Sequence, residues 1–390
     1  MIIKIIYGVI KMEIQKFREE IDRIDEELVN LFNKRMGVIR EVAQFKKDSQ
    51  TPLYDGERER QLITKAAELS DEDIELYTRV LFSTLTNVSR AYQSRVLNSD
   101  KQLADTIRTA LDTTPNLFPE RAIVACQGTE GAYSQHACEK MFKLPQIMYM
   151  SSFESVFKAV DSGLCRYGIL PLENSTAGSV SMVYDLMSRY NFYIVRSVRC
   201  RINHALLSKA TSLSQIKEIW SHEQAIEQCS QFLAEHKDIK VVPFRNTAAA
   251  AKEIAESGRT DVAVIASPDC AALYGLTMLR NNIRDNASND TRFICISKNL
   301  EVYPGADRTS VKLTLPHKPG SLYHILAKFF ASGINLVKLE SRPLPGSDFE
   351  FMFYFDVSES VYSPVLSSLL CELDAETEDF EYLGSYTELV

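Results

Sequence analysis

The sequence lacks the positive charge of a nucleic-acid-binding protein. Its 44 Lys and Arg residues are outnumbered by 52 Asp and Glu residues, which gives a net charge of -8. A protein that binds phosphates along DNA or RNA needs a dense basic face to release counterions, so nucleic acid is not an expected partner. An acidic protein that binds a small anion needs local clusters of Arg and Lys.

The chain also lacks the patterns of a metal or disulfide protein. None of its eight cysteines forms a C-x-x-C pair, and no histidine pattern accompanies them. We therefore expect neither a zinc site nor a disulfide framework, and we expect a reducing compartment.

Long apolar runs are missing as well. Residues 1–10 are apolar but are interrupted by Lys4. This stretch is too short to span a membrane and lacks a small-residue cleavage site. We interpret it as an extension before a second start at Met12, and we expect a soluble cytoplasmic protein without a membrane partner.

The composition that is present suits several globular domains. The chain has 390 residues, of which 45% are hydrophobic and 25% are charged. These values are ordinary for globular proteins, and the length accommodates two or three domains.

A heptad pattern begins near the N-terminus. Apolar residues at 14, 17, 21, 24, 28, 31, 38, 42 and 45 predict one long helix. Arg35 occupies a seam position, where a buried cation costs several kcal/mol unless it is paired or faces a ligand. Lys46 shares its face about 16 Å further along, whereas Arg18 is rotated by about 100° and could serve a second copy of the chain.

Two shorter helices are predicted next. The long helix should break at 48–52, a second should begin near Asp55, and a third should cover 71–97, with Ser89 and Gln93 one turn apart on one face. If their polar residues point inward, the three helices form a bundle around a polar, positively charged cavity. Spacing alone leaves open a solvated coiled-coil arm whose charges face water.

These residues closely resemble the active-site set of the all-helical chorismate mutases, over residues 12–97. The rearrangement of chorismate to prephenate needs no nucleophile, only clamps on two carboxylates and donors at the ether oxygen. The resemblance implies catalytic roles for Lys46 and Gln93 at the ether oxygen and for Glu59 at the hydroxyl. It implies substrate binding by Arg18, Arg35, Asp55, Arg58 and Ser89, with Arg18 reaching into the partner subunit's site.

The pattern changes after residue 97. Residues 98–120 collect Thr and Pro and predict a linker. From Arg121, short apolar runs alternate with helical stretches, which predicts an α/β fold. The expected strands are 122–126, 147–150, 167–170, 192–198, 239–242 and 262–266.

Several loops follow these strands. Residues 128–134 are not G-x-G-x-x-G, which disfavours a dinucleotide site; they could bind an anion or form a tight turn without a ligand. Residues 171–178 and His222 also follow strands, where open α/β sheets gather ligands. On its own, His222 is more typical of a surface or satisfied histidine than of a catalyst.

The motifs GTEGAYS, PLENSTAG, SHEQ, LYGL and NDTRF together resemble the prephenate dehydratase family, over residues 121–298. The resemblance implies two α/β lobes around a cleft, like a type II periplasmic binding protein, and a reaction that releases CO2 and water without a cofactor. It makes Thr291 the catalytic residue, acting by placement because a hydroxyl is a weak acid. It implies substrate binding by Asn174, Ser221, Gln228 and Arg292.

The third unit is predicted over residues 308–386. Strands at 310–315, 334–339, 349–357 and 380–384, with helices at 320–332 and 361–373, give the ferredoxin-like β-α-β-β-α-β order. Its motifs resemble the ACT regulatory domain, which holds phenylalanine at a subunit interface. Ser321 replaces the usual Ala. The implied effector-binding residues are Gly320, Ser321, Leu322, Asn335, Glu340, Ser341, Arg342 and Pro343.

The whole chain thus resembles a bifunctional chorismate mutase and prephenate dehydratase that is inhibited by L-phenylalanine and forms a homodimer or higher homo-oligomer. Two alternatives are an arogenate dehydratase and a phenylalanine-sensing binding protein with lost catalysis. A fused mutase that makes prephenate argues against the first. Retention of Thr291, Arg35, Lys46 and Gln93 argues against the second.

Overall fold

A computed structural model of the chain describes residues 2–49, 51, 55–97, 102–286, 288–344, 350–377 and 379–390. The chain divides into Met1–Leu103, which we call the helical unit, and a second unit formed by Ala104–Leu370 and Glu378–Val390, while Cys371–Thr377 groups with the helical unit. Some residues of predicted element boundaries, namely Gln50, Pro52, Phe349 and the first linker residues 98–101, lie outside the described residues.

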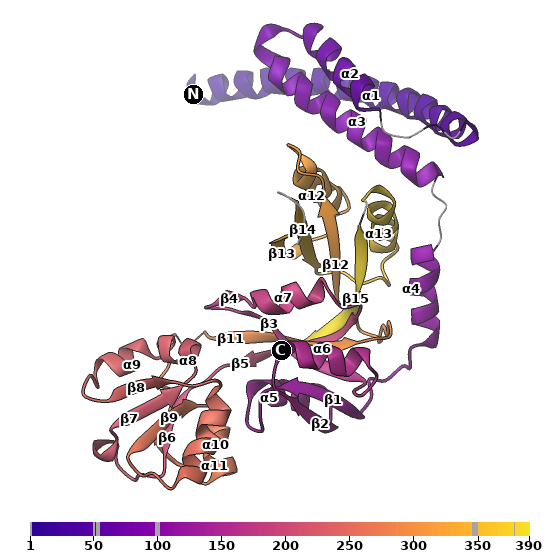
Figure 1. The fold of residues 1–390 in the computed structure, drawn as a ribbon. Coiled ribbons are helices and arrows are strands. Elements are labelled where there is room, and N and C mark those ends of the chain that lie inside the picture. The colour runs from indigo at the N-terminus through magenta and orange to yellow at the C-terminus, as the bar shows by residue number, and fades with distance from the viewer. Residues whose placement is uncertain are drawn as a thin grey trace. The chain divides into compact units, whose positions relative to one another are not determined.

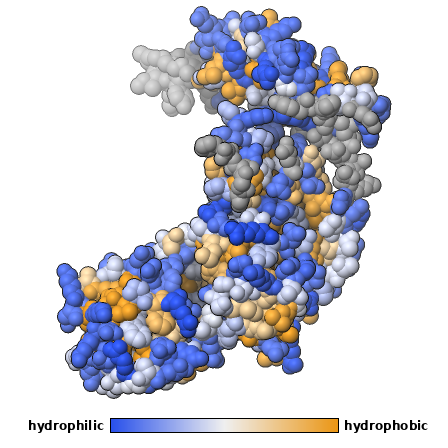
Figure 2. All heavy atoms as spheres, viewed as in Figure 1, coloured by the Kyte–Doolittle hydropathy of each residue, from blue (hydrophilic) through white to orange (hydrophobic). Residues whose placement is uncertain are grey.

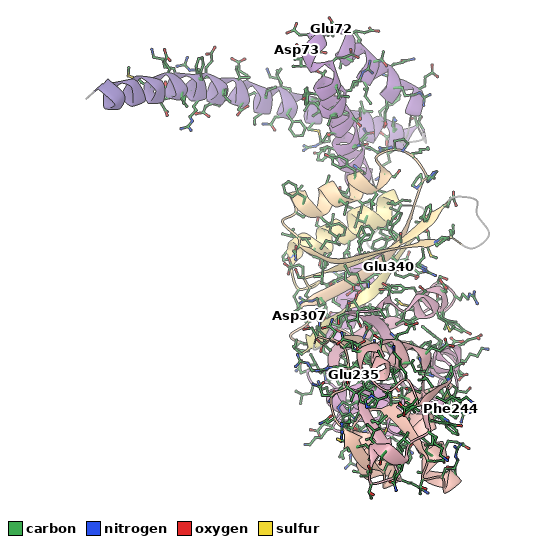
Figure 3. All side chains as sticks on the ribbon, turned by 90° about the vertical axis from the view of Figure 1, so that its left-hand side faces the viewer. Glu72, Asp73, Glu235, Phe244, Asp307 and Glu340 are labelled. Carbon is green, nitrogen blue, oxygen red and sulfur yellow. The ribbon has the colours of Figure 1, made fainter. Side chains whose placement is uncertain are left out.

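The heptad helix is confirmed as α1 (Ile2–Asp48) (Figure 1). It is followed by α2 (Gly56–Glu68), the short η1 (Glu72–Ile74) and α3 (Glu75–Leu97), and α3 packs against both α1 and α2. Every side chain from Met12 to Leu31 on α1 is exposed, including the apolar seam. Figure 3 shows these side chains projecting from the long helix. The predicted seam therefore exists but is not covered by described residues of the same chain.

The predicted linker is not entirely irregular. It contains helix α4 (Gln102–Thr113), which buries Ile107 and Ala110. The Val302 N–H donates to the Thr114 hydroxyl at 3.0 Å just after this helix. The composition of the predicted linker did not indicate this helix, because the Thr and Pro residues on which the prediction rested lie at the end of the helix and beyond.

The first lobe of the second unit is built on a sheet with the order β5-β11-β3-β1-β2, and β4 pairs with β3. Parallel strands β1, β2 and β3 confirm three predicted strands, and helices pack against them. The elements of this lobe are β1 (Arg121–Gln127), α5 (Tyr133–Met141), β2 (Leu144–Met150), α6 (Phe153–Asp161), β3 (Tyr167–Asn174), β4 (Gly178–Ser179), α7 (Ser181–Met187), β5 (Tyr193–Arg201) and β11 (Asp290–Ser297).

The second lobe is inserted between β5 and β11, so the chain crosses between the lobes twice. Its five-stranded sheet has the order β10-β6-β9-β7-β8. The strands are β6 (Ala205–Ser208), β7 (Glu218–Ser221), β8 (Lys240–Pro243), β9 (Val262–Ala266) and β10 (Thr277–Arg280). The helices are η2 (Leu213–Gln215), α8 (Glu223–Glu227), α9 (Ser230–Ala234), α10 (Thr247–Ser257) and α11 (Asp269–Tyr274).

The C-terminal domain has the predicted β-α-β-β-α-β order, with an antiparallel sheet ordered β13-β14-β12-β15. Its elements are β12 (Arg308–Leu315), α12 (Ser321–Ala331), β13 (Leu336–Pro343), β14 (Phe351–Val357), α13 (Pro364–Glu376) and β15 (Phe380–Leu389). The last strand runs on beyond the domain, and Thr387–Leu389 pairs in parallel with β5. The two sheets are thereby one continuous sheet (Figure 1).

The apolar core is continuous across this joint as well. Tyr354 and Leu383 of the C-terminal domain belong to the same buried cluster as Val156 and Tyr184 of the first lobe. The rings of Tyr184 and Tyr354 lie 4.9 Å apart, and the Tyr354 hydroxyl donates to the Tyr184 carbonyl oxygen at 3.2 Å. The C-terminal domain is therefore packed onto the first lobe rather than tethered beside it.

The surface of the second unit mixes polar and apolar residues (Figure 2). Among the helices in the described part of the chain, none has an apolar stretch of the length needed to cross a membrane.

Gly384 allows the close passage of β15 over β5. Its φ is +128°, and a Cβ atom built there would lie 2.4 Å from the Ile194 carbonyl oxygen. We expect Gly384→Ala to lower the free energy of unfolding by about 3 kcal/mol, because it adds a clash with the backbone to the strain of its φ angle. Chemical denaturation of the purified protein measures this loss.

Gly163→Ala is the matched control, because Gly163 also has a positive φ but has open space where the Cβ would stand. It should cost about 1 kcal/mol. Equal losses of unfolding free energy in the two variants would show that the close contact between Gly384 and β5 adds nothing to the cost of the positive φ angle.

Candidate functional sites

Arg35 turns from the exposed seam of α1 toward α3. Its Nη1 atom donates to the Ser89 hydroxyl and, at 3.4 Å, to the Leu85 carbonyl oxygen. Ser89 is buried and Arg35 is half-buried, and this burial lowers the pKa of the guanidinium. The arginine in the seam thus has the polar partners that a buried cation requires.

Gln93 lies one turn after Ser89 and is also buried. Its Oε1 atom is buried and makes no hydrogen bond within the part of the chain that the structure describes. Such an atom usually has a partner in native proteins, including water or a ligand. Lys46 and Glu59 are half-buried, and the Glu59 carboxylate lies 3.9 Å from the Arg90 guanidinium.

Three predicted substrate-binding residues are exposed in the single chain, unlike Arg35 and Ser89. Arg18 is exposed on the uncovered part of α1. A side-chain oxygen of Asp55 accepts a hydrogen bond from the Arg58 backbone N–H at 3.0 Å, which is the geometry of a helix N-cap. The Arg58 side chain is exposed. Within one chain, Asp55 therefore caps α2, and Arg18 lies away from the buried part of the helical unit.

Thr291 and Asn174 form a buried polar pair in the second unit. The two residues face each other across strands β11 and β3, and both are buried. The Asn174 Nδ2 atom donates to the Thr291 hydroxyl oxygen at 2.8 Å. Because the threonine oxygen accepts this bond, its own hydrogen remains available for a further acceptor.

The orientation of Asn174 is fixed by the loop that follows it. Its Oδ1 atom accepts hydrogen bonds from the backbone N–H groups of Thr176 and Ala177 at 3.0 and 2.9 Å. It also accepts one from the Thr176 hydroxyl at 2.6 Å. This Asx turn leaves Nδ2 as the atom that faces Thr291.

A chain of amides joins this pair to the second lobe. Asn174 Nδ2 also donates to Asn289 Oδ1 at 2.7 Å, and Asn289 Nδ2 donates to Gln228 Oε1 at 3.0 Å. The Nε2 atom of His204 lies 2.9 Å from the same Gln228 oxygen. Burial lowers the pKa of His204 and so favours the neutral imidazole, whose Nε2–H can donate to that oxygen.

Gln228 and Asn289 line a cleft of about 270 Å³ between the lobes. Thr291 and Asn174 are connected to its lining through Asn289. Amide and hydroxyl groups provide donors for an oxygen-rich ligand, and Asp285 is occupied as the cap of α9, where it accepts from the N–H of Ser230 at 2.9 Å. The lining consists of Thr176, Ala177, Gln224, Glu227, Gln228, Asp285, Asn286 and Asn289.

Sequence reasoning assigned no role to three of these residues. Thr176 and Asn289 are members of the motifs PLENSTAG and NDTRF, so a signal for them was present in the sequence. His204 follows the first crossing between the lobes without any motif. Only the fold brings it to Gln228.

Ser221 lies at the end of β7, where it is fully buried and donates to the Ile265 carbonyl oxygen at 2.7 Å. Its described hydrogen bond is therefore internal to the second lobe. The nearby His222 caps α8 by accepting from the Gln224 N–H at 3.3 Å, which agrees with the satisfied histidine favoured for it. In the glycine-rich turn, the Gly131 N–H donates to Gln135 Oε1 at 2.8 Å, as in a tight turn without a ligand.

Arg292 is not placed as predicted. It was expected among the cleft residues, but its guanidinium lies on the opposite face of β11 from Thr291 and is buried against the C-terminal domain. Its Nη1 atom lies 2.6 Å from Asp356 Oδ2, and its Nη2 atom donates to the Tyr386 hydroxyl at 2.6 Å. The physical reason is strand alternation, because successive side chains of a strand point to opposite faces.

The predicted effector residues lie on α12 and β13 or, for Gly320 and Asn335, directly before them. Gly320 has a φ of +90° before α12, with open space beyond it. On β13, Glu340 and Arg342 face the first lobe: the Ser179 hydroxyl donates to Glu340 at 2.6 Å, and Arg342 pairs with Asp185 at 2.7 Å. Figure 3 labels Glu340 at this joint. Ser341 and Pro343 alternate with them and are exposed, as are Leu339 and Val337.

The chain is similar to known proteins over nearly its whole length. It matches the families Prephenate dehydratase over residues 124–301 and Chorismate mutase type II over residues 17–94. The bifunctional chorismate mutase/prephenate dehydratase of Aquifex aeolicus is 29% identical, over 96% of this chain and 98% of that protein. The one from Stutzerimonas stutzeri is 30% identical, over 97% and 98%.

A solved structure resembles the second unit. The prephenate dehydratase from Arthrobacter aurescens, determined in complex with L-Phe, is 29% identical, with a TM-score of 0.63. The match covers 68% of this chain and 89% of the Arthrobacter aurescens chain.

Proposed function

Because the chain belongs to the family of bifunctional chorismate mutase/prephenate dehydratases, we propose that its two reactions occur at the two sites described above. The protein rearranges chorismate to prephenate and then converts prephenate to phenylpyruvate, two steps of phenylalanine biosynthesis. The first reaction belongs to the helical unit and the second to the cleft. The observation that carries the second assignment is the hydrogen bond from Asn174 to Thr291, which leaves the threonine hydrogen free to donate.

The mutase reaction requires placement rather than acid–base chemistry. Chorismate must be held in a folded conformation while negative charge develops on its ether oxygen. Arg35 is an inward cation suited to a substrate carboxylate, since guanidinium groups bind carboxylates in a fixed geometry. Buried Gln93 and half-buried Lys46 supply the polar groups for the ether oxygen, and Glu59 those for the hydroxyl.

The dehydratase reaction breaks two bonds of prephenate. The electrons of the bond to the departing carboxylate enter the ring as CO2 leaves, and the ring hydroxyl takes up one proton, supplied overall by the solvent, and departs as water. Thr291 donates a hydrogen bond to that hydroxyl, and the bond from Asn174 holds the threonine oxygen in place. Gln228 and Asn289 offer amide N–H groups to the rest of the substrate.

The C-terminal domain acts in this proposal as an ACT domain that binds L-phenylalanine. The β-α-β-β-α-β order and the residues of α12 and β13 support this role. Strand β13 is at the edge of its sheet, where a second copy can add its own strand. A ligand held there would act at the interface of two subunits.

A second copy also accounts for α1. Its exposed seam includes Phe17, Ile21, Ile24 and Leu28, each more than half exposed. An uncovered heptad seam is stabilised by pairing with another helix. In a homodimer, the exposed Arg18 of one chain would then complete the mutase site of its partner.

Separate sites predict reciprocal losses. Thr291→Ala should lower the dehydratase kcat by about a hundredfold or more, because it removes the donor to the leaving hydroxyl, and leave mutase activity within about twofold of wild type. Lys46→Ala should lower the mutase activity and leave the dehydratase kcat near that of wild type. Assays that follow chorismate loss and phenylpyruvate formation from added prephenate measure both. Parallel loss of both activities in a folded variant would contradict the assignment.

A mutase site shared between subunits predicts complementation. Arg18→Ala and Arg35→Ala should each abolish mutase activity. A mixture unfolded and refolded together should regain about a quarter of wild-type activity, because half the dimers are mixed and each has one intact site. The two variants refolded separately and then assayed together provide the control. No recovery would place Arg18 in the site of its own chain.

An ACT domain predicts feedback inhibition. L-phenylalanine should inhibit the dehydratase in a saturable manner, and Gly320→Ala should raise the half-inhibitory concentration about tenfold or more by straining the turn before α12. Gly163→Ala is the control for a left-handed glycine outside the C-terminal domain. Each variant is compared with its own uninhibited rate. A flat response of the wild-type enzyme would remove the regulatory role.

A further inference from the structure

A group of buried and half-buried polar side chains joins strands β3 and β11 to the C-terminal domain. We call it the interdomain charge network; its members are Glu173 of β3, Arg292 of β11, Lys338 of β13, Asp356 of β14 and Tyr386 of β15. Two of them come from the first lobe and three from the C-terminal domain. Neither the dehydratase role nor the regulatory role proposed above assigns a function to this network.

Arg292 is the centre of the network. Its guanidinium is 3% exposed and contacts carboxylates from three strands: Asp356 at 2.6 Å, Glu173 at 3.4 Å and Glu388 at 3.5 Å. Tyr386 accepts from it at 2.6 Å. Asp356 is itself held by the Ser310 hydroxyl. The position of Arg292 is therefore set mainly by the C-terminal domain.

Glu173 is the second contact between the domains. Its carboxylate pairs with Lys338, and that ammonium also donates to the Ser179 hydroxyl at 2.9 Å. Burial opposes ionisation of Glu173, but Lys338 and Arg292 outweigh it and hold the pKa of this carboxyl below its usual range. Ser179 in turn donates to Glu340, so this contact reaches the strand that carries the proposed effector residues.

The network touches the catalytic pair through the backbone. Thr291 and Asn174 are partners across β11 and β3, and the next partners on the same two strands are Arg292 and Glu173. Because side chains alternate, one pair faces the cleft side and the other faces the C-terminal domain. The pairing also has a bulge directly after Arg292. Bulges re-aim neighbouring side chains and concentrate near active sites.

We infer that Glu173 and Arg292 are positioning residues, and that Lys338 and Asp356 act through them to set the geometry of the Asn174–Thr291 hydrogen bond. The C-terminal domain then controls turnover in the cleft by moving two charges on adjacent strands. This inference rests on the proposed assignment of the dehydratase reaction to Thr291. It differs from that assignment in naming the contacts through which another domain acts.

The test removes the charges on the C-terminal side and leaves the cleft residues unchanged. Lys338→Met and Asp356→Asn should each lower the dehydratase kcat about tenfold or more, because small misplacements of a reacting group have large effects on rate. The KM for prephenate should change less than about twofold, since the groups that bind substrate remain. The thermal unfolding midpoint of each variant reports the integrity of the second unit.

Two further variants separate positioning from general stability. Lys338→Arg keeps the charge and should retain most of the kcat. Lys312→Met removes a lysine of the same sheet that is more deeply buried than Lys338 and lies outside the network, with Glu381 as its partner at 2.6 Å. It should leave the kcat near wild type. If Lys338→Met and Asp356→Asn behave as Lys312→Met does, the inference is wrong.

A double-mutant cycle tests the path. Glu173→Gln combined with Lys338→Met should lower kcat no more than the stronger single variant, because both break one contact. Additive losses would overturn the path through Glu173. In the Lys338→Met variant, L-phenylalanine should inhibit at least tenfold less effectively.

The outcomes also separate this inference from the proposed function. If the wild-type enzyme turns over prephenate but is not inhibited by L-phenylalanine, the regulatory role is wrong. The comparison of kcat values still tests whether Lys338 and Asp356 position the catalytic pair. If Thr291→Ala retains dehydratase activity, the assignment of the site fails and the inference fails with it.

Discussion

The buried guanidinium of Arg292 constrains the architecture of the second unit. An ion removed from water costs several kcal/mol unless opposite charges and hydrogen bonds replace its hydration. Here the replacements come from β3, β14 and β15, which belong to two domains. Loss of one partner from such a pair costs about 3–5 kcal/mol, because it leaves an uncompensated charge behind. The C-terminal domain therefore cannot separate from the first lobe without exposing or stranding this cation.

The continuous sheet follows the same constraint. β15 pairs with β12 inside the C-terminal domain and with β5 inside the first lobe, so one strand fixes the orientation of both sheets. The aromatic contact of Tyr184 with Tyr354 closes the apolar side of the joint. The backbone pairing, the aromatic contact and the ion pairs of Arg292 all hold the C-terminal domain in one position on the first lobe. A movement of that domain that breaks one of these contacts therefore breaks all three.

The periodic parts of this fold were predictable from the sequence. Heptad spacing gave α1, and short apolar runs gave most strands of the two lobes, because one buried face of each element repeats along the chain. Helix α4 was missed because the prolines beyond it dominated the composition of its segment. Arg292 was misassigned although the information was available: a residue next to Thr291 on a strand must face the other way. His204 could not be found, since only the chain crossing brings it to Gln228.

The position of Arg292 also fits the chemistry better than a carboxylate clamp would. A cation fixed against the departing carboxylate would bind most strongly before the reaction, when the negative charge is still there, and would lose that interaction as neutral CO2 forms. Such a contact stabilises the ground state more than the transition state and slows the step. The cleft lining instead presents amides, the Thr176 hydroxyl and the carboxylates of Glu227 and Asp285, and the Arg292 guanidinium is turned away from it. The proposed mutase site would have no such conflict, because both carboxylates of chorismate persist in prephenate and a fixed cation such as Arg35 would hold them throughout.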